Sequence, residues 1–425
     1  MKLRSIFLSL SMIMAIGVMA MTPFRTHRFE QFRVLPGREN AIVFFGNSIT
    51  NMFEWSEALG NDPRVLNRGV SGAMTGELLD NTDIVTSLHP AKVFIGIGTN
   101  DLGNPELCSP DSVAARITAI VKRIRRESPQ TEVYVQSILP SDNGIRTLDA
   151  IRDTNAKVKP QVEESGAVYI DLYDLLSGIV SKDISYDGLH LSARGYALWL
   201  DAISEYTGLK PVFGTDITEN NGGIDWNSFG MRNTYFSAYP VASNDILILG
   251  DEMIHGGEWR ELLDRPNVKN RGTGWGYGGL SMDKWIENTD AIFGANGNKA
   301  APAKIVLYAG TEELYAPESD TEKILDGYRK WIERIREYAP ASTTGIEILS
   351  LIPRNEPELD STLTIPFNSA LAKMAAAGDN IGYIDIYTPL SVMEEGKSCA
   401  NPLYVSDNFL TGAGYTLVAD ILSGI

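Results

Sequence analysis

Two kinds of segment alternate along the first half of the chain. Short apolar or β-branched runs closed by Gly, Asn, Asp or Pro are typical of strands, and residues 112–127 place apolar side chains at helical spacing. The near-continuous apolar character of residues 93–97 suits a parallel sheet covered on both faces. The pattern therefore predicts a five-stranded parallel α/β/α sandwich. The expected strands are residues 41–45, 64–67, 92–97, 131–137 and 167–170.

The second half repeats this series. Gly46-Asn47-Ser48-Ile49 returns as Gly250-Asp251-Glu252-Met253, an offset of 204 residues (250 − 46). Further pairs are Asn67-Arg68-Gly69 with Asn270-Arg271-Gly272, Gly98-Thr99 with Gly310-Thr311, and Gly195-Tyr196 with Gly414-Tyr415. Its expected strands are residues 245–249, 267–270, 304–309, 346–350 and 381–384, with helices at 321–338 and 411–422. Two units of this length indicate a domain duplication, so differences between the copies are informative about chemistry.

Composition and the repeat together set the domain organisation. A chain of 425 residues that is 44% hydrophobic is long enough for two separate cores. Phe32 and Pro36 precede the first copy as Phe236 and Pro240 precede the second, at the same offset. We therefore expect a first domain at residues 21–209, a linker rich in Gly, Asn and Thr at 210–231, and a second domain at 232–425.

Residues 1–20 have the pattern of a secretory signal peptide. Lys2 and Arg4 precede an apolar stretch, and Val18-Met19-Ala20 offers a cleavage site. We expect an exported protein, periplasmic or extracellular, with an uncleaved anchor helix as the alternative. The net charge of −17 argues against nucleic acid or an anionic membrane surface as a partner.

The only two cysteines, Cys108 and Cys399, stand one in each copy. Two cysteines do not make a disulfide framework. They are either two unpaired thiols or one bridge between the domains.

Polar residues follow the predicted strands of the first copy. Ser48 follows the first strand, Gly72 the second and Asn100 the third, while Asp187 and His190 follow the fifth. Ligands of open parallel sheets bind at the carboxyl ends of the strands, so these residues are expected to converge.

The converging residue types are those that acyl transfer requires. Ser48 offers a nucleophilic hydroxyl, His190 a base, and Asp187, three residues earlier, a group that can orient the imidazole. The backbone N–H groups of Ser48 and Gly72 and the side-chain amide of Asn100 can stabilise an oxyanion.

Four sequence blocks resemble those of the SGNH (GDSL-type) hydrolases. They are Gly46-Asn47-Ser48-Ile49-Thr50, Asn67-Arg68-Gly69-Val70-Ser71-Gly72, Gly98-Thr99-Asn100-Asp101 and Asp187-Gly188-Leu189-His190-Leu191-Ser192. The resemblance covers residues 28–207 and implies a metal-independent esterase with a flavodoxin-like sheet, in which Ser48, Gly72, Asn100 and His190 are the functional residues and Asp187 completes the triad. It is nearest to bacterial acetylhydrolases and carbohydrate O-acetylesterases.

Two positions depart from the family pattern. Asn47 stands where the family usually has Asp, and Ala73 stands where Asp often follows the glycine. Neither is the nucleophile, the base or an oxyanion donor, so we expect altered specificity and not inactivity.

The first copy offers little support for a metal or a cofactor. No third ligand stands near Asp187 and His190 in the sequence. Gly96-Ile97-Gly98 lacks the third glycine of a dinucleotide-binding loop, because Asp101 occupies that place. We expect neither group.

The second copy has lost these catalytic residues. Glu252 stands at the position of Ser48, Glu312 at that of Asn100, Phe409 at that of His190 and Ser406 at that of Asp187. Without a hydroxyl, an imidazole or an amide donor, the mechanism cannot operate there. We therefore expect a non-catalytic domain whose default role is structural.

Two features leave a ligand-binding role open for the second copy. Trp275 and Tyr277 replace the small residues of the second block, and aromatic faces on a Gly-rich loop can stack on sugar rings or form an interface. The carboxylates of Glu252, Glu312, Glu313 and Asp407 could hold a cation, form a new hydrolytic pair or simply be solvated.

The sequence thus predicts an exported serine esterase that removes short acyl groups, above all acetyl, from a carbohydrate. A lipid or thioester acylhydrolase is the alternative within enzymes. A non-catalytic glycan-binding protein is the alternative of another class.

Overall fold

The computed structural model describes residues 21–217, 228–273, 280–293 and 300–425. The expected signal peptide, Trp275, Tyr277 and part of the expected linker lie outside these residues. In the described part of the chain, no helix is long and apolar enough to cross a membrane.

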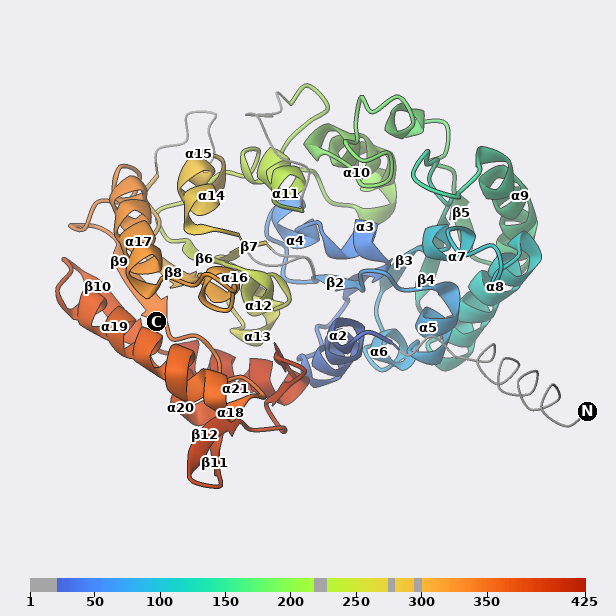
Figure 1. The fold of residues 1–425 in the computed structure, drawn as a ribbon. Helices are drawn as coiled ribbons and strands as arrows, with labels where there is room; N and C mark the ends of the chain where they lie inside the picture. Colours follow the sequence, from blue (N-terminus) through green and yellow to red (C-terminus); the bar gives the residue numbers. More distant parts are fainter. Residues whose placement is uncertain (1–20, 218–227, 274–279, 294–299) are drawn as a thin grey trace, which may run out of the picture.

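The first domain is built on a five-stranded parallel sheet with strand order β2-β1-β3-β4-β5 (Figure 1). Its strands are β1 Ile42–Gly46, β2 Val65–Gly69, β3 Lys92–Gly96, β4 Glu132–Gln136 and β5 Val168–Ile170. This order is that of flavodoxin-like folds, which place their ligand site where the order reverses, next to β1.

Helices cover both faces of this sheet. The helices are α3 Ser48–Asn51, α4 Trp55–Ala58, α5 Thr75–Asp80, α6 Asp83–Thr86, α7 Thr99–Leu102, α8 Pro110–Glu127, α9 Leu148–Glu164 and α10 Ala193–Thr207. Side chains of β1 alternate between the faces, because Val43 and Phe45 pack in a cluster with α8 and α9, and Ile42 and Phe44 pack in another with α10. Both clusters are cores of buried apolar and aromatic side chains, as the sequence pattern predicts.

The second domain repeats this architecture. Its sheet order is β7-β6-β8-β9-β10, with β6 Ile246–Gly250, β7 Val268–Gly272, β8 Lys304–Tyr308, β9 Gly345–Leu349 and β10 Ile381–Ile384. Its helices are α12 Glu252–His255, α13 Trp259–Leu262, α14 Met282–Glu287, α15 Thr289–Ile292, α16 Thr311–Leu314, α17 Thr321–Arg336, α18 Pro357–Leu359, α19 Ile365–Ala376, α20 Tyr387–Leu390 and α21 Gly412–Leu422. The predicted fold of two tandem α/β/α domains is confirmed.

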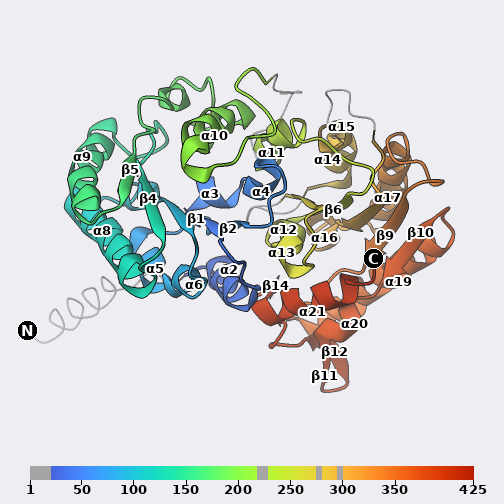
Figure 2. The same cartoon turned by 180° about the vertical axis from the view of Figure 1, so that it is seen from behind.

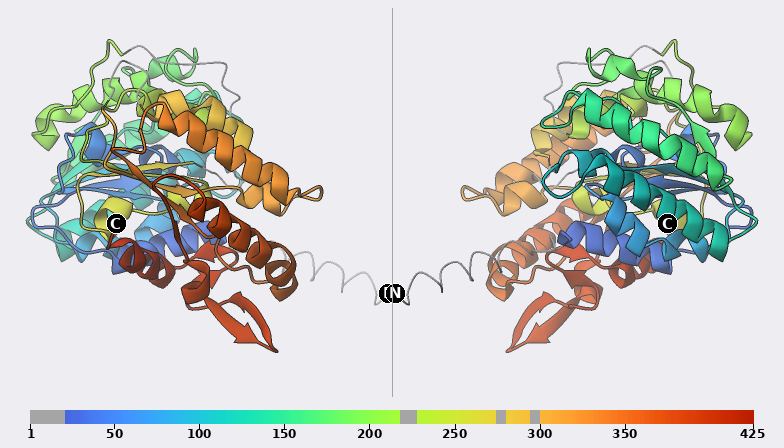
Figure 3. Two further views of the ribbon diagram at one scale, coloured as in Figure 1. Left: turned by 90° about the vertical axis from the view of Figure 1, so that its left-hand side faces the viewer. Right: turned by 90° about the vertical axis from the view of Figure 1, so that its right-hand side faces the viewer.

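Two short hairpins of the second domain were not predicted. Strands β11 Ser391–Glu394 and β12 Lys397–Ala400 form an antiparallel arm that projects from the body of the molecule (Figure 3). Strands β13 Val405–Ser406 and β14 Phe409–Leu410 form a smaller hairpin just before α21.

Two lead-in helices bridge the domains. Helix α2 (Pro23–Val34) precedes the first sheet but lies along α21 of the second domain, as Figures 1 and 2 both show. Helix α11 (Ser228–Phe236) precedes the second sheet and packs against α10 of the first domain and α15 of the second. Each domain is therefore completed by the helix that leads into the other one.

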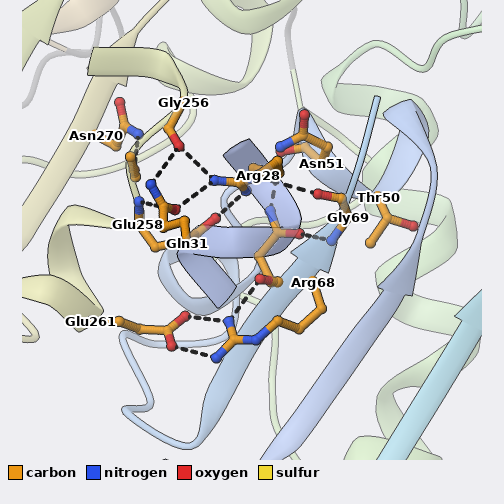
Figure 4. A network of polar contacts seen from close by, with 12 residues as sticks. Arg28, Gln31, Thr50, Asn51, Arg68, Gly69, Gly256, Glu258, Glu261 and Asn270 are labelled. Atoms are coloured by element: carbon orange, nitrogen blue, oxygen red, sulfur yellow. Dashed lines mark hydrogen bonds and ion pairs between the residues drawn. The ribbon is translucent and has the colours of Figure 1, made fainter. Parts of the chain in front are cut away.

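The contacts of the two bridging helices are equivalent. Arg28 on α2 donates to the carbonyl of Gly256 at 2.8 Å and pairs with Glu258 (Figure 4). Arg232 on α11 donates to the carbonyl of Met52 at 2.7 Å and to Glu54 at 2.7 Å. All three pairs of equivalent residues are 204 apart (232 − 28, 256 − 52, 258 − 54). The domains are thus related across the interface as two copies of one unit.

Two buried ion pairs repeat the same reciprocity. Arg68 of β2 makes a bidentate contact with Glu261 of α13 at 2.9 and 2.8 Å. Arg271 of β7 makes the corresponding contact with Glu57 of α4 at 2.7 and 2.6 Å. The shared Asn-Arg-Gly motif therefore holds the two domains together.

Candidate active site

The residues of the first domain that were predicted to be catalytic follow neighbouring strands. Gly46, Gly69 and Gly96 pair across β2, β1 and β3 in register. Ser48 begins α3 two residues after Gly46, and Asn100 lies in α7 four residues after Gly96. The strand ends therefore direct these side chains to one edge of the sheet.

Ser48, His190 and Asp187 form a hydrogen-bonded chain. The Oγ atom of Ser48 lies 2.9 Å from Nε2 of His190, and Nδ1 of His190 lies 2.7 Å from Oδ2 of Asp187. These distances are within hydrogen-bond reach of a nucleophile, a base and an orienting carboxylate.

The surroundings of Asp187 keep it ionised. Burial raises its pKa, but the hydrogen bond and charge of His190, together with the backbone N–H groups of His190 and Leu189, lower the pKa to about 2. Those two N–H groups donate to Oδ1 at 2.8 and 2.9 Å. An ionised carboxylate only accepts, so Nδ1 of His190 carries the proton toward it and Nε2 is left to accept from the Ser48 hydroxyl.

The side chain of Asn100 is held in a fixed orientation. Its Nδ2 donates to the carbonyl of Ala73 at 2.9 Å, and its Oδ1 accepts from Nη2 of Arg146 at 3.5 Å. One N–H of the amide is thereby committed, and the second is left for an oxyanion. Gly72, one residue before Ala73, has a φ of +78°, which favours glycine at this turn.

Two arginines of this region were missed by sequence reasoning. Arg25 of α2 donates to the carbonyl of Gly72 at 2.9 Å and pairs with Glu77 of α5 at 3.3 Å. Arg146 donates from Nε to the carbonyl of Thr99 at 2.9 Å. Neither arginine lies in a motif block. The only signal was that Arg146 follows the fourth strand on the catalytic edge.

The departures from the family pattern have structural explanations. Asn47 is buried, and its Oδ1 accepts from the N–H of Ile49 at 3.0 Å, so it caps α3 as an Asp would. Ala73 is fully buried and supplies the carbonyl that accepts from Asn100. Both positions shape the site without entering the reaction.

The shared residues of the two copies hold the same loops. Asn67 donates to the carbonyls of Asn51 and Phe53, and Asn270 donates to those of Ile254 and Gly257. Trp55 and Trp259 likewise each donate to a carbonyl of the preceding short helix, at 2.8 and 2.7 Å. What is common to the copies is therefore fold, as the repeat predicted.

In the second domain, the hairpin β13–β14 replaces the loop that carries Asp187 in the first domain. The backbone hydrogen bond from the N–H of Thr411 to the carbonyl of Tyr404 corresponds to the one from the N–H of Ser192 to the carbonyl of Ile184. The segment between these partners is one residue shorter, because Asp407 and Asn408, both with positive φ, make a tight two-residue turn. Phe409 stands at the His190 position, and Ser406 lies opposite it on the other strand.

The acidic residues of the second domain do not all lie together. Glu252, Glu312 and Asp407 line one pocket. Glu313 instead accepts from the N–H of Met282 at 3.0 Å, as Asp101 accepts from that of Thr75 in the first domain. Glu313 is therefore a structural counterpart of Asp101. Trp275 and Tyr277 belong to the residues outside the described structure.

Comparison with known proteins agrees with the first domain's geometry. The GDSL-like Lipase/Acylhydrolase family matches residues 44–198, a span that contains Ser48, Gly72, Asn100, Asp187 and His190. Platelet-activating factor acetylhydrolase IB subunit alpha2 of Gallus gallus is 31% identical over 175 residues, 38% of this chain and 72% of the chicken protein. The chain belongs to the GDSL-like lipase/acylhydrolase family. It is accordingly a carboxylic ester hydrolase.

Solved structures are also similar to this GDSL-family chain. A lipase/acylhydrolase from Enterococcus faecalis is 23% identical and covers 41% of this chain and 98% of its own, with a TM-score of 0.36. An acetyl-xylooligosaccharide esterase from Geobacillus Stearmophilus, solved as a mutant, is 19% identical and covers 41% of this chain and 96% of its own, with a TM-score of 0.35.

Proposed function

We propose that the first domain hydrolyses short-chain esters, above all acetyl esters of carbohydrates, through an acyl-enzyme on Ser48. The observation that carries the mechanism is the hydrogen-bonded chain from Ser48 through His190 to Asp187, at 2.9 and 2.7 Å. Ser48 Oγ attacks the ester carbonyl while Nε2 of His190 takes its proton. The carbonyl oxygen becomes an oxyanion that the N–H groups of Ser48, Gly72 and Asn100 stabilise.

Collapse of this intermediate breaks the bond to the alcohol. His190 passes its proton to the leaving alkoxide, so that a neutral alcohol departs and Ser48 carries the acyl group. Water then attacks the acyl-enzyme, with His190 again as the base, and the carboxylic acid leaves as Ser48 regains its proton. Asp187 stays ionised and stabilises the imidazolium in both halves of the reaction.

One observation supports a short acyl group. The chicken relative is by name an acetylhydrolase.

Turnover of 4-nitrophenyl esters tests the mechanism and the acyl preference together. Ser48→Ala is expected to abolish hydrolysis, and residual turnover at the wild-type rate would refute the assignment of the nucleophile. The kcat/KM values should fall from acetyl to butyryl to octanoyl esters. A preference for the octanoyl ester would favour a lipid acylhydrolase, and a covalent serine probe that labels no site would favour a binding protein without turnover.

The carbohydrate part of the proposal needs its own substrate series. Acetylated xylan, acetylated mannan and an O-acetylated sialic acid, each incubated with the full-length protein, should release acetate at different rates. If none of them releases acetate while 4-nitrophenyl acetate is still hydrolysed, the proposal of a carbohydrate substrate is refuted and the proposal of an esterase stands.

We further propose that the protein is exported and that its second domain does not catalyse. The N-terminal residues 1–20 have the composition of a signal peptide, and Glu252 and Phe409 replace the nucleophile and the base. N-terminal sequencing of protein secreted by the native cell should begin near residue 21. A mature protein that begins at Met1 would contradict export by cleavage.

A further inference from the structure

The second domain keeps a pocket at the edge where the first domain keeps its triad. The cavity has a volume of about 380 Å³ and is formed at the ends of β6 and β8, the hairpin β13–β14 and the segment after β9. This volume is in the range of sites that hold small molecules, roughly 300–1,000 Å³. The loss of the triad has therefore not closed the site.

The pocket is lined by the buried carboxyl group of Asp251. Asp251 is only 3% exposed, and its Oδ2 has no hydrogen-bond partner among the described residues. Burial, joined by the charge of Glu252, raises the pKa of Asp251 to about 7. A buried carboxyl oxygen without a partner destabilises the fold. Asp251 stands at the position of Asn47, the buried cap of α3, so this group is part of the shared fold that forms the wall of the pocket.

The cation of the pocket comes from a position that has no charge in the first domain. Leu351 and Ile138 each donate a backbone N–H to an asparagine, which aligns the segments at an offset of 213 residues (351 − 138). Arg354 therefore stands where the first domain has Ser141. Its guanidinium lies over the Tyr315 ring at 4.4 Å, and its Nε has no hydrogen-bond partner among the described residues.

The remaining walls supply carboxyl oxygens and aromatic carbon. Burial, with the charge of Glu313, raises the pKa of Glu312. Phe409 and Tyr415 line the apolar part, and Phe24 of the bridging helix α2 supports Phe409 edge-on at 6.5 Å between ring centroids. Among the described residues, no three His, Cys, Asp or Glu side chains gather closely enough to hold a metal ion.

We propose that this pocket binds a neutral saccharide, with Asp251, Glu312 and Arg354 on its hydroxyl groups and Phe409 and Tyr415 against its apolar face. Carboxyl groups accept from hydroxyls, a guanidinium donates to them, and aromatic rings pack against the C–H face of a pyranose. The excess of acidic residues over Arg354 in the lining opposes an anionic ligand. The site is independent of the Ser48 chemistry.

Binding is tested on full-length Ser48→Ala protein, so that hydrolysis does not enter the measurement. Isothermal titration calorimetry with xylotetraose, cellotetraose, mannotetraose and chitotetraose should detect at least one ligand. Glucuronic acid and glucosamine, the anionic and cationic probes, should bind more weakly than glucose. Absence of binding by all four oligosaccharides, or tightest binding of a charged probe, would overturn the proposal.

Pocket variants show where the saccharide binds. Arg354→Met and Glu312→Ala should each weaken binding about tenfold or more, the loss expected for one charge-assisted hydrogen bond. The matched control Glu322→Ala lies in the separate groove between α17 and α19 and should leave the affinity unchanged. Wild-type affinity in both pocket variants would place the sugar elsewhere and overturn the proposal.

A separate measurement keeps this result apart from the proposed esterase. The Arg354→Met and Glu312→Ala substitutions are made again in protein that retains Ser48, and 4-nitrophenyl acetate turnover should stay at the wild-type rate. If sugar binding is lost while turnover remains, the pocket is confirmed as a site of its own. If turnover is absent from the wild type while the pocket binds sugar, the esterase proposal alone fails.

Discussion

Removing the charge of Glu261 should strongly destabilise the protein. The Arg68 side chain is 0% exposed and that of Glu261 is 4% exposed, and two hydrogen bonds at 2.9 and 2.8 Å join them. The substitution Glu261→Gln keeps the size of the side chain but leaves the guanidinium of Arg68 buried without its counter-charge. Breaking one partner of such a pair costs roughly 3–5 kcal/mol of unfolding free energy.

The corresponding pair predicts a larger loss at Glu57. This carboxylate contacts Arg271 and also has Lys269 at 3.8 Å, whereas the first domain has Leu66 at the Lys269 position. Glu57→Gln therefore leaves two buried cations uncompensated. The surface pair of Arg33 and Asp83, with both side chains more than 40% exposed, provides the control, and Asp83→Asn should cost less than about 1 kcal/mol.

Urea unfolding followed by circular dichroism measures these differences. The expected order of destabilisation is Glu57→Gln, then Glu261→Gln, then Asp83→Asn. The double variant Arg68→Met with Glu261→Leu should recover most of the loss, since apolar side chains of similar volume replace a buried ion pair at little cost. A Glu261→Gln loss no larger than that of Asp83→Asn, or a double variant less stable than the single one, would refute the reasoning.

Further outcomes follow from the site and from the thiols. Asn100→Ala should lower kcat for 4-nitrophenyl acetate on the order of 100-fold with little change in KM, because the amide acts on the oxyanion and not on the bound ester. A rise in KM as large as the fall in kcat would contradict this. Asp187→Asn should slow the same reaction on the order of 10³–10⁴-fold, because the amide no longer fixes the protonated Nδ1 of His190. The folded-state pKa of Asp187 is about 2, below its ordinary 3.8. The ionised carboxylate therefore contributes its full stabilisation above pH 3.8, and this is lost as the pH falls toward 2. Asp187→Asn should lower the urea midpoint more at pH 6 than at pH 2, and an equal change at both pH values would refute this. Because Cys108 and Cys399 are both buried and free, dithiothreitol should leave the Tm unchanged, and a lower Tm under reduction would reveal a bridge.

Periodicity was sufficient to predict the sheets. Every predicted strand overlaps an observed one. Most are short apolar runs in a doubly covered sheet, and the more polar β2 and β7 were found because the Asn-Arg-Gly motif repeats. The arm β11–β12 was not predicted, since its strands are short and only partly buried and carry no apolar alternation against a core.

The candidate site was predictable where chemistry and motif coincide. Ser48 and His190 stand in contiguous blocks, and the structure brings them within 2.9 Å. Arg25 could not be found in this way, because its contact with Gly72 depends on how α2 packs against the second domain. Likewise, the sequence identified the Arg-Gly motifs as repeated but gave no sign that Arg68 and Arg271 reach across to the opposite domain.

The reciprocal arginine contacts have an evolutionary consequence. An interface in which residue i of one unit meets residue j of the other, and j meets i, is the isologous interface of a two-fold homodimer. Fusion of two copies of a dimer-forming ancestor would yield such an arrangement in one polypeptide. Each arginine then stays under selection to match a glutamate in the other half. Selection therefore preserves Arg68 and Arg271 as a pair while the equivalent positions of Ser48 and Glu252 diverge. One half of an ancestral symmetric enzyme is then free to acquire a different ligand.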